Sequence, residues 1–153
     1  MQLKPFYTVR LHYPRGWDVE VKGDHGVESH DFYFAEGRVE GGLTGVFRAA
    51  NHPRRRVDGP YLMNMNGFIE LEAGGLIMVE YRGYGRAYPR GRRQVVGAAF
   101  HVTDHPEHKR LNDVVCAIAG EVRVPHPPPE PLEQKHVQLV FSVAELIWEA
   151  PPD

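Results

Sequence analysis

The chain has a single cysteine, no long apolar run and almost no excess of charge. One cysteine among 153 residues excludes an internal disulfide, and its place in the apolar run 114–119 favours a buried, unreactive thiol over a nucleophile. Nowhere do 18 apolar residues follow one another, which excludes a membrane-spanning helix. The first residues also lack the charged and apolar segments of a signal peptide. We therefore expect a cytoplasmic protein that has no membrane partner.

The charges nearly cancel. Eighteen Lys and Arg against twenty Asp and Glu give a net charge of -2, so no overall field would hold a nucleic-acid backbone. The run Arg82-Gly83-Tyr84-Gly85 imitates an RNA-recognition strand, but Arg86 stands where a stacking aromatic is required. We expect no nucleic-acid partner.

The arginines at 54–56 and at 86, 90, 92 and 93 are interpreted as solvated loop tips. The alternative is a pair of basic loops at a barrel mouth that steer a carboxylate-bearing ligand inward.

Several cofactor motifs are missing as well. The chain has no glycine-rich phosphate cradle, no Gly-x-Ser-x-Gly elbow and no dinucleotide fingerprint, so we expect no cofactor. His101, His105 and His108 lie close in sequence, and three imidazoles could hold zinc or iron. His101 falls in a predicted strand, however, while the other two straddle a helix start, so they would not share a face. We expect no metal and interpret them as scattered histidines.

What the chain does have is a series of short β-patterned segments. Its composition, 42% apolar and 25% charged, is typical of a packed domain, and its length suits one domain over residues 1–153. Segments with a period of two are separated by glycine and proline turns from residue 6 to residue 143. The clearest pair, 67–72 and 76–83, flanks the tight turn Ala73-Gly74-Gly75. This pattern predicts an all-β fold: a single closed or nearly closed antiparallel β-barrel of about eight to ten strands, with an internal pocket.

Breaks in the pattern give the expected strand ends. Pro14-Arg15-Gly16 is expected to end the first strand, Glu36-Gly37 to turn the chain, and residues 83–93 to form a glycine and arginine loop. Glycines at 41, 42 and 45 predict a sharp bend, because a glycine inside a strand marks a bulge, a corner or a close backbone approach.

Only one short helix is predicted. Asp104 could cap it, Pro106 suits its first turn, and it has room for about two turns. After it, the strand-like run 114–124 is followed by five prolines in residues 125–131, which predict a stiff connection between strands.

The order of several short signatures resembles a known family. The signatures are Gly37-Arg38-Val39-Glu40-Gly41 with Gly45 following, Asp58-Gly59 before a strand, the run from Gly75 to Gly83, and Leu111-Asn112 before an apolar strand. Together they span about residues 5 to 145 and resemble the bacterial proteins grouped as the 3237 family of domains of unknown function. This resemblance implies a small antiparallel β-barrel with an internal pocket, and no settled chemistry. The chain departs from the family at Asn64 and Asn66, where relatives tend to carry an acidic residue and an arginine.

Polar groups on otherwise apolar strands are the candidate site. Glu80 and Arg82 share one face of their strand and Tyr81 lies on the other. If Glu80 and Arg82 point inward, burial would raise the pKa of Glu80 and Arg82 would lower it, which leaves a base beside a fixed cation. If they point outward, they form a solvated pair. In the inward case, Tyr81 or His101 could relay a proton.

Three kinds of ligand-binding group complete the prediction. Asn64 and Asn66 could hold a carbonyl or a developing oxyanion, and His12 could bind the ligand directly. Asn112 is a further candidate, although it also suits the cap of a turn or strand start.

These groups lead to two hypotheses of different classes. The first is a cofactor-independent lyase, isomerase or cyclase that acts on a small oxygenated apolar compound, such as an aromatic or polyketide-like one. The alternative is a non-catalytic carrier or sensor of such ligands, and a purely structural protomer would have a filled barrel. Exposed aromatics and paired loops could also support a homodimer.

Overall fold

The computed structural model describes residues 1–88 and 92–152. Within these residues nine strands and two short 3-10 helices are present. They are β1 (Gln2–Gly23), β2 (Gly26–Gly41), β3 (Gly45–Asn51), β4 (Arg54–Arg55), β5 (Tyr61–Leu71), β6 (Leu76–Tyr88), β7 (Arg92–Val102), η1 (Pro106–Asp113), β8 (Cys116–Arg123), η2 (Gln134–His136) and β9 (Gln138–Ile147).

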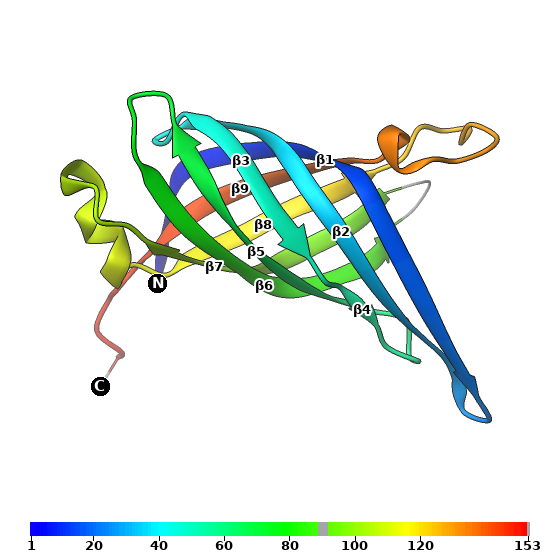
Figure 1. Cartoon of the computed structure of the whole chain (residues 1–153). Coiled ribbons are helices and arrows are strands. Elements are labelled where there is room, and N and C mark those ends of the chain that lie inside the picture. Colours follow the sequence, from blue (N-terminus) through cyan, green and yellow to red (C-terminus); the bar gives the residue numbers. More distant parts are fainter. Residues whose placement is uncertain (89–91, 153) are drawn as a thin grey trace.

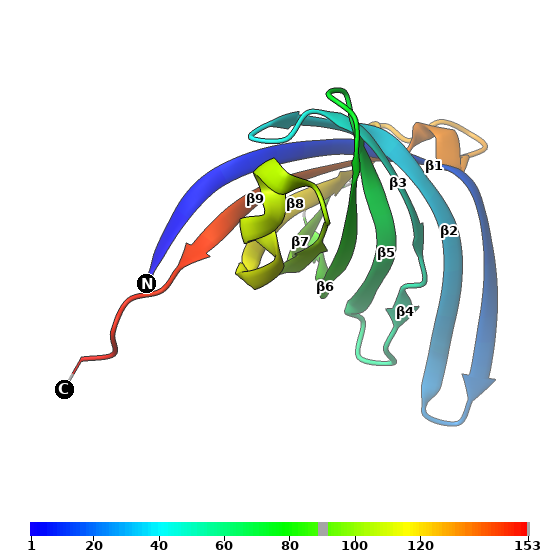
Figure 2. The ribbon, with the colours of Figure 1, turned by 60° about the vertical axis from the view of Figure 1, so that its left-hand side comes forward.

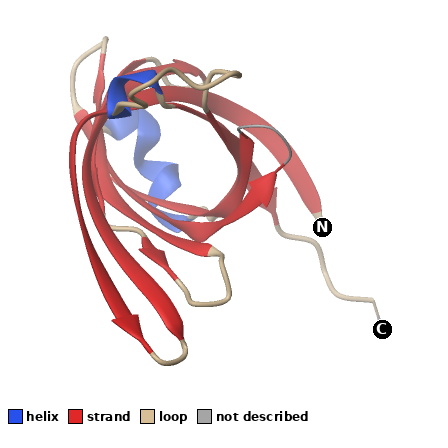
Figure 3. Ribbon diagram, turned by 90° about the vertical axis from the view of Figure 1, so that its right-hand side faces the viewer, coloured by secondary structure: helices blue, strands red, loops and turns tan. Residues whose placement is uncertain are grey.

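The sheet closes on itself. Its order is β1-β9-β8-β7-β6-β5-β3-β2, and β1 also pairs with β2, so the strands form a continuous antiparallel ring. The small strand β4 adds to β2 and β5 at one end. Figure 3 shows the ring of strands viewed from one end. The predicted all-β barrel architecture is confirmed, and closure leaves the strands of the ring without the open edges that favour aggregation.

The first strand is longer than predicted. β1 continues through Pro14-Arg15-Gly16, where a strand end was expected, and that expectation is wrong. The pairing with β2 shifts register between His12 and Arg15, so the proline occupies a bulge. A bulge tolerates proline because the extra residue is left out of the hydrogen-bond ladder. The continued strand and its partner β2 form an arm that projects beyond one end of the ring (Figure 1).

The turn expected at Glu36-Gly37 is also wrong, because β2 runs through it. A Cβ atom on Gly37 would lie 2.1 Å from the carbonyl oxygen of Arg10, so glycine here allows two backbones to approach closely. The predicted bend does occur after Gly41, which ends β2 with a φ of 120°.

Residues 83–93 do not form the expected loop. β6 extends to Tyr88 and β7 begins at Arg92, so most of this segment is strand, while Arg90 lies outside the described residues. Gly83 pairs with Gly97 across the two strands, and a Cβ on Gly97 would lie 2.1 Å from the carbonyl oxygen of Arg82. Glycine at this pair lets the sheet curve tightly. The hairpin at Gly74 and Gly75 is confirmed, and both glycines have positive φ.

One end of the barrel is closed by η1 (Figure 2). Its Leu111 is buried among the core side chains, and Pro106 lies in the first turn as predicted. The expected cap at Asp104 is wrong: His105 occupies the N-cap position, and its side chain makes no capping hydrogen bond. Among the described residues, no helix has the length and apolarity needed to span a membrane.

Candidate functional site

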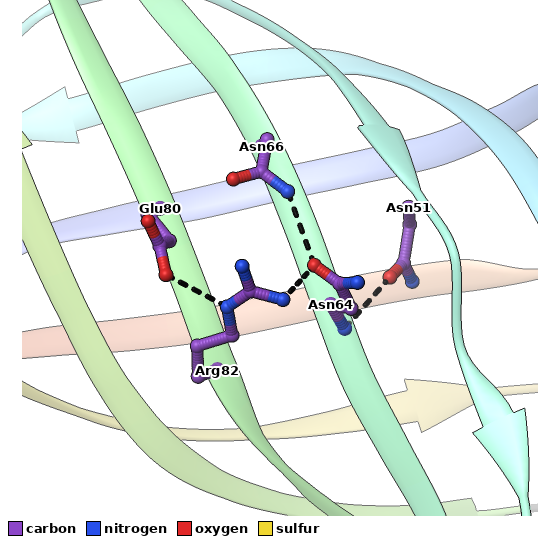
Figure 4. Close-up of polar contacts among 5 residues, drawn as sticks. All are labelled: Asn51, Asn64, Asn66, Glu80 and Arg82. Carbon is purple, nitrogen blue, oxygen red and sulfur yellow. Dashed lines mark hydrogen bonds and ion pairs between the residues drawn. The ribbon is translucent and has the colours of Figure 1, made fainter.

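Four of the predicted site residues lie on the outer face of the barrel. Glu80 and Arg82 on β6 form an ion pair of 2.7 Å, and Arg82 also donates to the side chain of Asn64. Asn66 donates to the same Asn64 oxygen (Figure 4). Their neighbours Val79 and Tyr81 are buried. The hypothesis that these four groups converge in an internal pocket is therefore wrong, because the alternation of β6 turns Glu80 and Arg82 toward solvent.

The other two predicted ligand-binding residues also lie outside the core. His12 is exposed on β1, just before the bulge. Asn112 accepts a hydrogen bond from the backbone N–H of Thr103 (2.8 Å) and donates to the Thr103 carbonyl (3.0 Å). It thus joins the end of η1 to the residue after β7, which is the structural role named above as the alternative.

We expect the change Asn112→Ala to lower the free energy of unfolding by about 1–2 kcal/mol, because both Thr103 backbone groups lose their partner. Urea unfolding followed by circular dichroism measures this. The matched control is Asn66→Ala on the outer face, which should change stability by less than about 0.5 kcal/mol. Equal effects of the two changes would contradict the proposed cap.

Two predicted catalytic residues, Tyr81 and His101, do lie inside the barrel, and both contact Tyr7 there. The hydroxyl of Tyr7 is 2.6 Å from the hydroxyl of Tyr81 and 2.7 Å from Nε2 of His101. Burial raises the pKa of Tyr7 well above its ordinary value, and the nearby Tyr81 adds to the effect. Both phenols therefore stay protonated at neutral pH.

The protonation of His101 follows from these contacts. Its Nδ1 is buried and has no hydrogen-bond partner among the residues that the structure describes. If Nδ1 carries the proton, Nε2 accepts from Tyr7, Tyr7 accepts from Tyr81, and only one donor is unsatisfied. The other tautomer would leave both the Nδ1 lone pair and the Tyr81 proton unsatisfied, so we assign the proton to Nδ1. Burial lowers the pKa of His101 to about 4, against a smaller opposing effect of Glu145.

The thiol of Cys116 behaves as predicted. Cys116 is fully buried and free, and burial raises its pKa to about 11. It stays a protonated thiol at neutral pH and is not a nucleophile.

A cavity of about 410 Å³ is lined by residues from the end of the barrel that carries β4 and η2. Figure 1 shows that η1 lies at the opposite end. Most of its wall is apolar, as ligand sites usually are. We call it the mouth cavity. Its apolar lining consists of Pro53, Met63, Val95, Val122, Val124, Leu132, Val137, Leu139 and Phe141, and its polar lining includes Tyr13, Asp31, Tyr33, Asn51, Tyr61 and Arg93.

A hydroxyl donor lies in the wall of the mouth cavity. Asn51 donates to the Tyr13 hydroxyl at 2.7 Å, and the Asn51 carbonyl oxygen accepts from the backbone N–H of Asn64 at 3.3 Å. The ring of Tyr13 stacks on Tyr33, with centroids 4.4 Å apart. Burial raises the pKa of Tyr13 far above its ordinary value. Since its oxygen is already an acceptor, its proton can be donated to a ligand.

Opposite charges flank this hydroxyl. Asp31 is only 6% exposed, and its Oδ1 accepts a hydrogen bond from Ser29 at 2.8 Å. The second carboxylate oxygen has no hydrogen-bond partner among residues 1–88 and 92–152, so it is available to a ligand. On β7, the Arg93 guanidinium lies 4.0 Å from the ring centre of Tyr61. The Arg93 charge lowers the pKa of Tyr13 and the Asp31 charge raises it, both less strongly than burial does.

Phe141 separates the mouth cavity from the buried Tyr7, Tyr81 and His101. Phe141 lines the cavity, and its ring meets that of Tyr81 edge-on, with centroids 6.2 Å apart. None of the three buried groups is part of the described lining. A ligand in the mouth cavity would therefore reach Asp31 and Tyr13 directly, and His101 only beyond Phe141.

Arg93 belongs to the predicted basic-loop alternative, but Tyr13 and Asp31 are absent from the predicted site. Tyr13 shares the apolar face of its strand with Tyr7, Val9 and Leu11, which marks it as inward. Asp31 alternates with Phe32 and Phe34, and that apolar pair misleads because it faces outward.

Three arginines of the predicted basic loops line one cavity, although Arg55 lies on β4 and Arg93 on β7 and not on loops. Arg55, Arg56 and Arg93 line a second cavity of about 390 Å³. It shares Tyr61 and Arg93 with the mouth cavity, so the two adjoin. Of the other arginines in these predicted loops, Arg90 lies outside the described residues.

Among the described residues, one group could hold a metal ion. Ligand atoms of His105, Glu107 and His108 lie within 4.8 Å of one another at the closed end of the barrel. Two imidazoles and a carboxylate are a donor set that zinc accepts. The prediction that the three histidines would not share a face is confirmed: the ring centres of His105 and His108 are 5.1 Å apart, whereas His101 is not part of this group. His101 is separate from them, inside the barrel.

Exposed aromatic side chains lie on the arm. Trp17, Phe32 and Phe34 contact one another on its outer side, and each is more than a third exposed. They are the exposed aromatics on which the homodimer hypothesis depends, and that hypothesis stays a prediction.

No protein-family model matches the chain, and no curated protein matches its sequence. The resemblance to the 3237 family therefore stays a prediction.

Solved structures, in contrast, share the fold. A protein of unknown function from Clostridium acetobutylicum has a TM-score of 0.76 at 13% identity, over 96% of this chain and 100% of its own. A β-barrel-like protein from Acinetobacter baumannii has a TM-score of 0.71 at 17% identity, over 94% of each chain. An enzyme from Penicillium herquei has a TM-score of 0.58 at 13% identity, over 93% of each chain. The chain thus has a β-barrel-like fold that a known enzyme also adopts.

Proposed function

We propose that the protein binds a small, oxygenated and mostly apolar molecule in the mouth cavity and catalyses proton transfer on it without a cofactor. The observation that carries this proposal is a mostly apolar cavity with a buried carboxylate, a hydroxyl donor and a guanidinium in its wall. The corresponding reaction class is that of lyases, isomerases and cyclases. Aromatic or polyketide-like carbonyl compounds suit both the apolar lining and the polar groups.

Each polar group has a distinct role in this proposal. The free oxygen of Asp31 removes a proton from a carbon next to the substrate carbonyl, and Ser29 holds the carboxylate in place. The Tyr13 hydroxyl and the Arg93 guanidinium stabilise the negative charge that develops on the carbonyl oxygen. Return of the proton to another carbon gives an isomerase, and loss of a leaving group from the neighbouring carbon gives a lyase.

The polar lining favours an enzyme over a carrier. A carrier needs apolar contacts and a few orienting hydrogen bonds, and it gains nothing from a buried acid beside an unpaired cation. Within the described residues, Arg93 makes no ion pair with a carboxylate. The fold of the Penicillium herquei enzyme agrees with this proposal, although its similarity shows the fold alone.

The proposal can be tested without knowing the substrate. An enzyme that removes protons next to a carbonyl group exchanges those protons with solvent. We therefore expect the purified protein to catalyse deuterium uptake from D2O by at least one member of a panel of enolisable aryl ketones and 1,3-diketones, measured by mass spectrometry. Compounds that bind but never exchange above the buffer rate would favour the carrier.

A matched pair of variants tests the place of binding. Val95 is 4% exposed and lines the mouth cavity, whereas its neighbour Val96 is 45% exposed on the outside. We expect Val95→Phe to weaken binding of the neutral fluorescent probe N-phenyl-1-naphthylamine by at least about tenfold, because the ring occupies ligand space. Val96→Phe should leave the affinity unchanged. Val122→Phe at the same cavity is the second variant, in case Val95→Phe does not fold. If the parent protein and the three variants bound the probe with equal affinity, the probe would bind outside the mouth cavity.

A further inference from the structure

The cavity lined by Arg55, Arg56 and Arg93 differs sharply from the mouth cavity beside it. We call it the vestibule. Its other described lining residues are Val27, Val57, Gly59 and Tyr61, so the described part of its wall contains three guanidinium groups and no carboxylate. The protein as a whole has a net charge of -2. The excess of positive charge is therefore a local feature of the vestibule.

Arg93 belongs to both cavities. Tyr61 is also shared, and the Arg93 guanidinium stacks on its ring, which fixes the position of the charge. Within the described residues Arg93 has no carboxylate partner, in contrast to the surface arginines Arg38, Arg48 and Arg82. A guanidinium held on an aromatic ring at the junction of two cavities can bind an anion that enters from either side.

The other two arginines are only partly neutralised. Arg55 on β4 lies 4.0 Å from the carboxylate of Glu20, at the limit of an ion pair. Arg56 pairs with Asp58 at 2.8 Å, and both side chains are about half exposed. Such exposed pairs exchange readily with a ligand, because each is worth about 1 kcal/mol or less.

We propose that the substrate of the mouth cavity carries an acidic group, and that the vestibule binds this group while the apolar body lies in the mouth cavity. This inference rests on the proposed function. The shared chemistry is a carboxylate or phosphate on an aromatic or similarly apolar skeleton. Arginine suits both anions, because its planar fork presents paired N–H donors.

Two fluorescent probes with the same skeleton test the inference. 1-Anilinonaphthalene-8-sulfonate is N-phenyl-1-naphthylamine with an added sulfonate. We expect the anionic probe to bind at least about tenfold more tightly than the neutral one, the size expected of one charge-assisted contact. The preference should shrink as salt is raised from about 0.05 M to 0.5 M, whereas binding of the neutral probe should not weaken.

Arginine variants then locate the anion. We expect Arg55→Gln to weaken binding of the anionic probe by about tenfold and to change binding of the neutral probe by less than about twofold, because Arg55 lines the vestibule and not the mouth cavity. Arg56→Gln is the second variant, since Arg56 also lines only the vestibule. The matched control is Arg48→Gln on the outer face, where Arg48 pairs with Glu36 and Glu70. Competition by 2-naphthoate, 2-naphthyl phosphate and neutral 2-naphthamide shows which anion is preferred.

The outcomes separate this inference from the proposed function. Equal affinities of the two probes, or equal losses of both in Arg55→Gln, would overturn the vestibule and leave the mouth cavity intact. The preference for the anionic probe could also depend on the arginines and yet stay unchanged in Val95→Phe. The anion would then bind without the mouth cavity, and the proposal that one ligand occupies both cavities would be wrong. If neither probe binds at all, both proposals fail.

Discussion

Replacing Asp31 by asparagine is expected to lower the rate of deuterium exchange by at least about a hundredfold, because the amide cannot accept the proton. The asparagine has nearly the same shape, and its oxygen can still accept the hydrogen bond from Ser29. Binding of N-phenyl-1-naphthylamine should therefore change by less than about twofold. A fall in rate with unchanged binding is the result expected of a base, since the ground-state contacts are preserved.

The control for this change is Asp113→Asn. Asp113 is exposed at the end of η1, at the closed end of the barrel, so the same chemical change there should leave exchange unaffected. Undiminished exchange in Asp31→Asn would remove Asp31 from the mechanism. Loss of exchange together with loss of probe binding would mean that Asp31 shapes the cavity and does not act as a base.

The architecture could be predicted from the sequence because it depends on local patterns. The hairpin around Gly74 and Gly75 shows this: alternating strands and two positive-φ glycines are all encoded within about fifteen residues. The errors occurred where a local signal for a break was overruled by pairing with a distant strand. Gly37 resembles a turn residue, yet it is needed where the backbone of β1 passes close to β2.

The orientation of each strand was harder to predict than its existence. Period-two alternation shows that Glu80 and Arg82 share a face, but it does not say which face is inside. The β1–β2 arm shows why apolarity can mislead. Phe32 and Phe34 point outward there, and the opposite face carries the buried Asp31, because that face lines the mouth cavity.

The candidate site could not be assembled from the sequence at all. Tyr13 meets Asn51, and Arg93 stacks on Tyr61, across 38 and 32 positions of the chain. Such contacts depend on the order of strands around the ring and on their register, and neither is a local property. The two predicted site residues that lie inside, Tyr81 and His101, are on the apolar faces of their strands, and the closure of the ring turns those faces inward.

His101 gives the second large effect, which is on stability. Its pKa is about 4 in the folded protein because the ring is buried, against an ordinary value of 6.5. Between these values the unfolded chain takes up a proton that the folded protein does not, so stability falls as the pH is lowered from about 6.5 to 4. The stability present above pH 6.5 and lost by pH 4 amounts to about 3 kcal/mol from this one group.

The change His101→Gln should remove this loss. Glutamine does not titrate, and its amide can still hydrogen-bond the Tyr7 hydroxyl. The fall in unfolding free energy between pH 7 and pH 4, measured by urea unfolding, should be smaller by about 3 kcal/mol in this variant than in the parent protein. His12→Gln makes the same replacement at an exposed position and should follow the parent curve. Parallel curves for all three proteins would show that His101 is protonated as easily in the folded barrel as in the unfolded chain. In that case the Nδ1–H group of the buried ring would have to donate to a hydrogen-bond acceptor, which the described contacts lack.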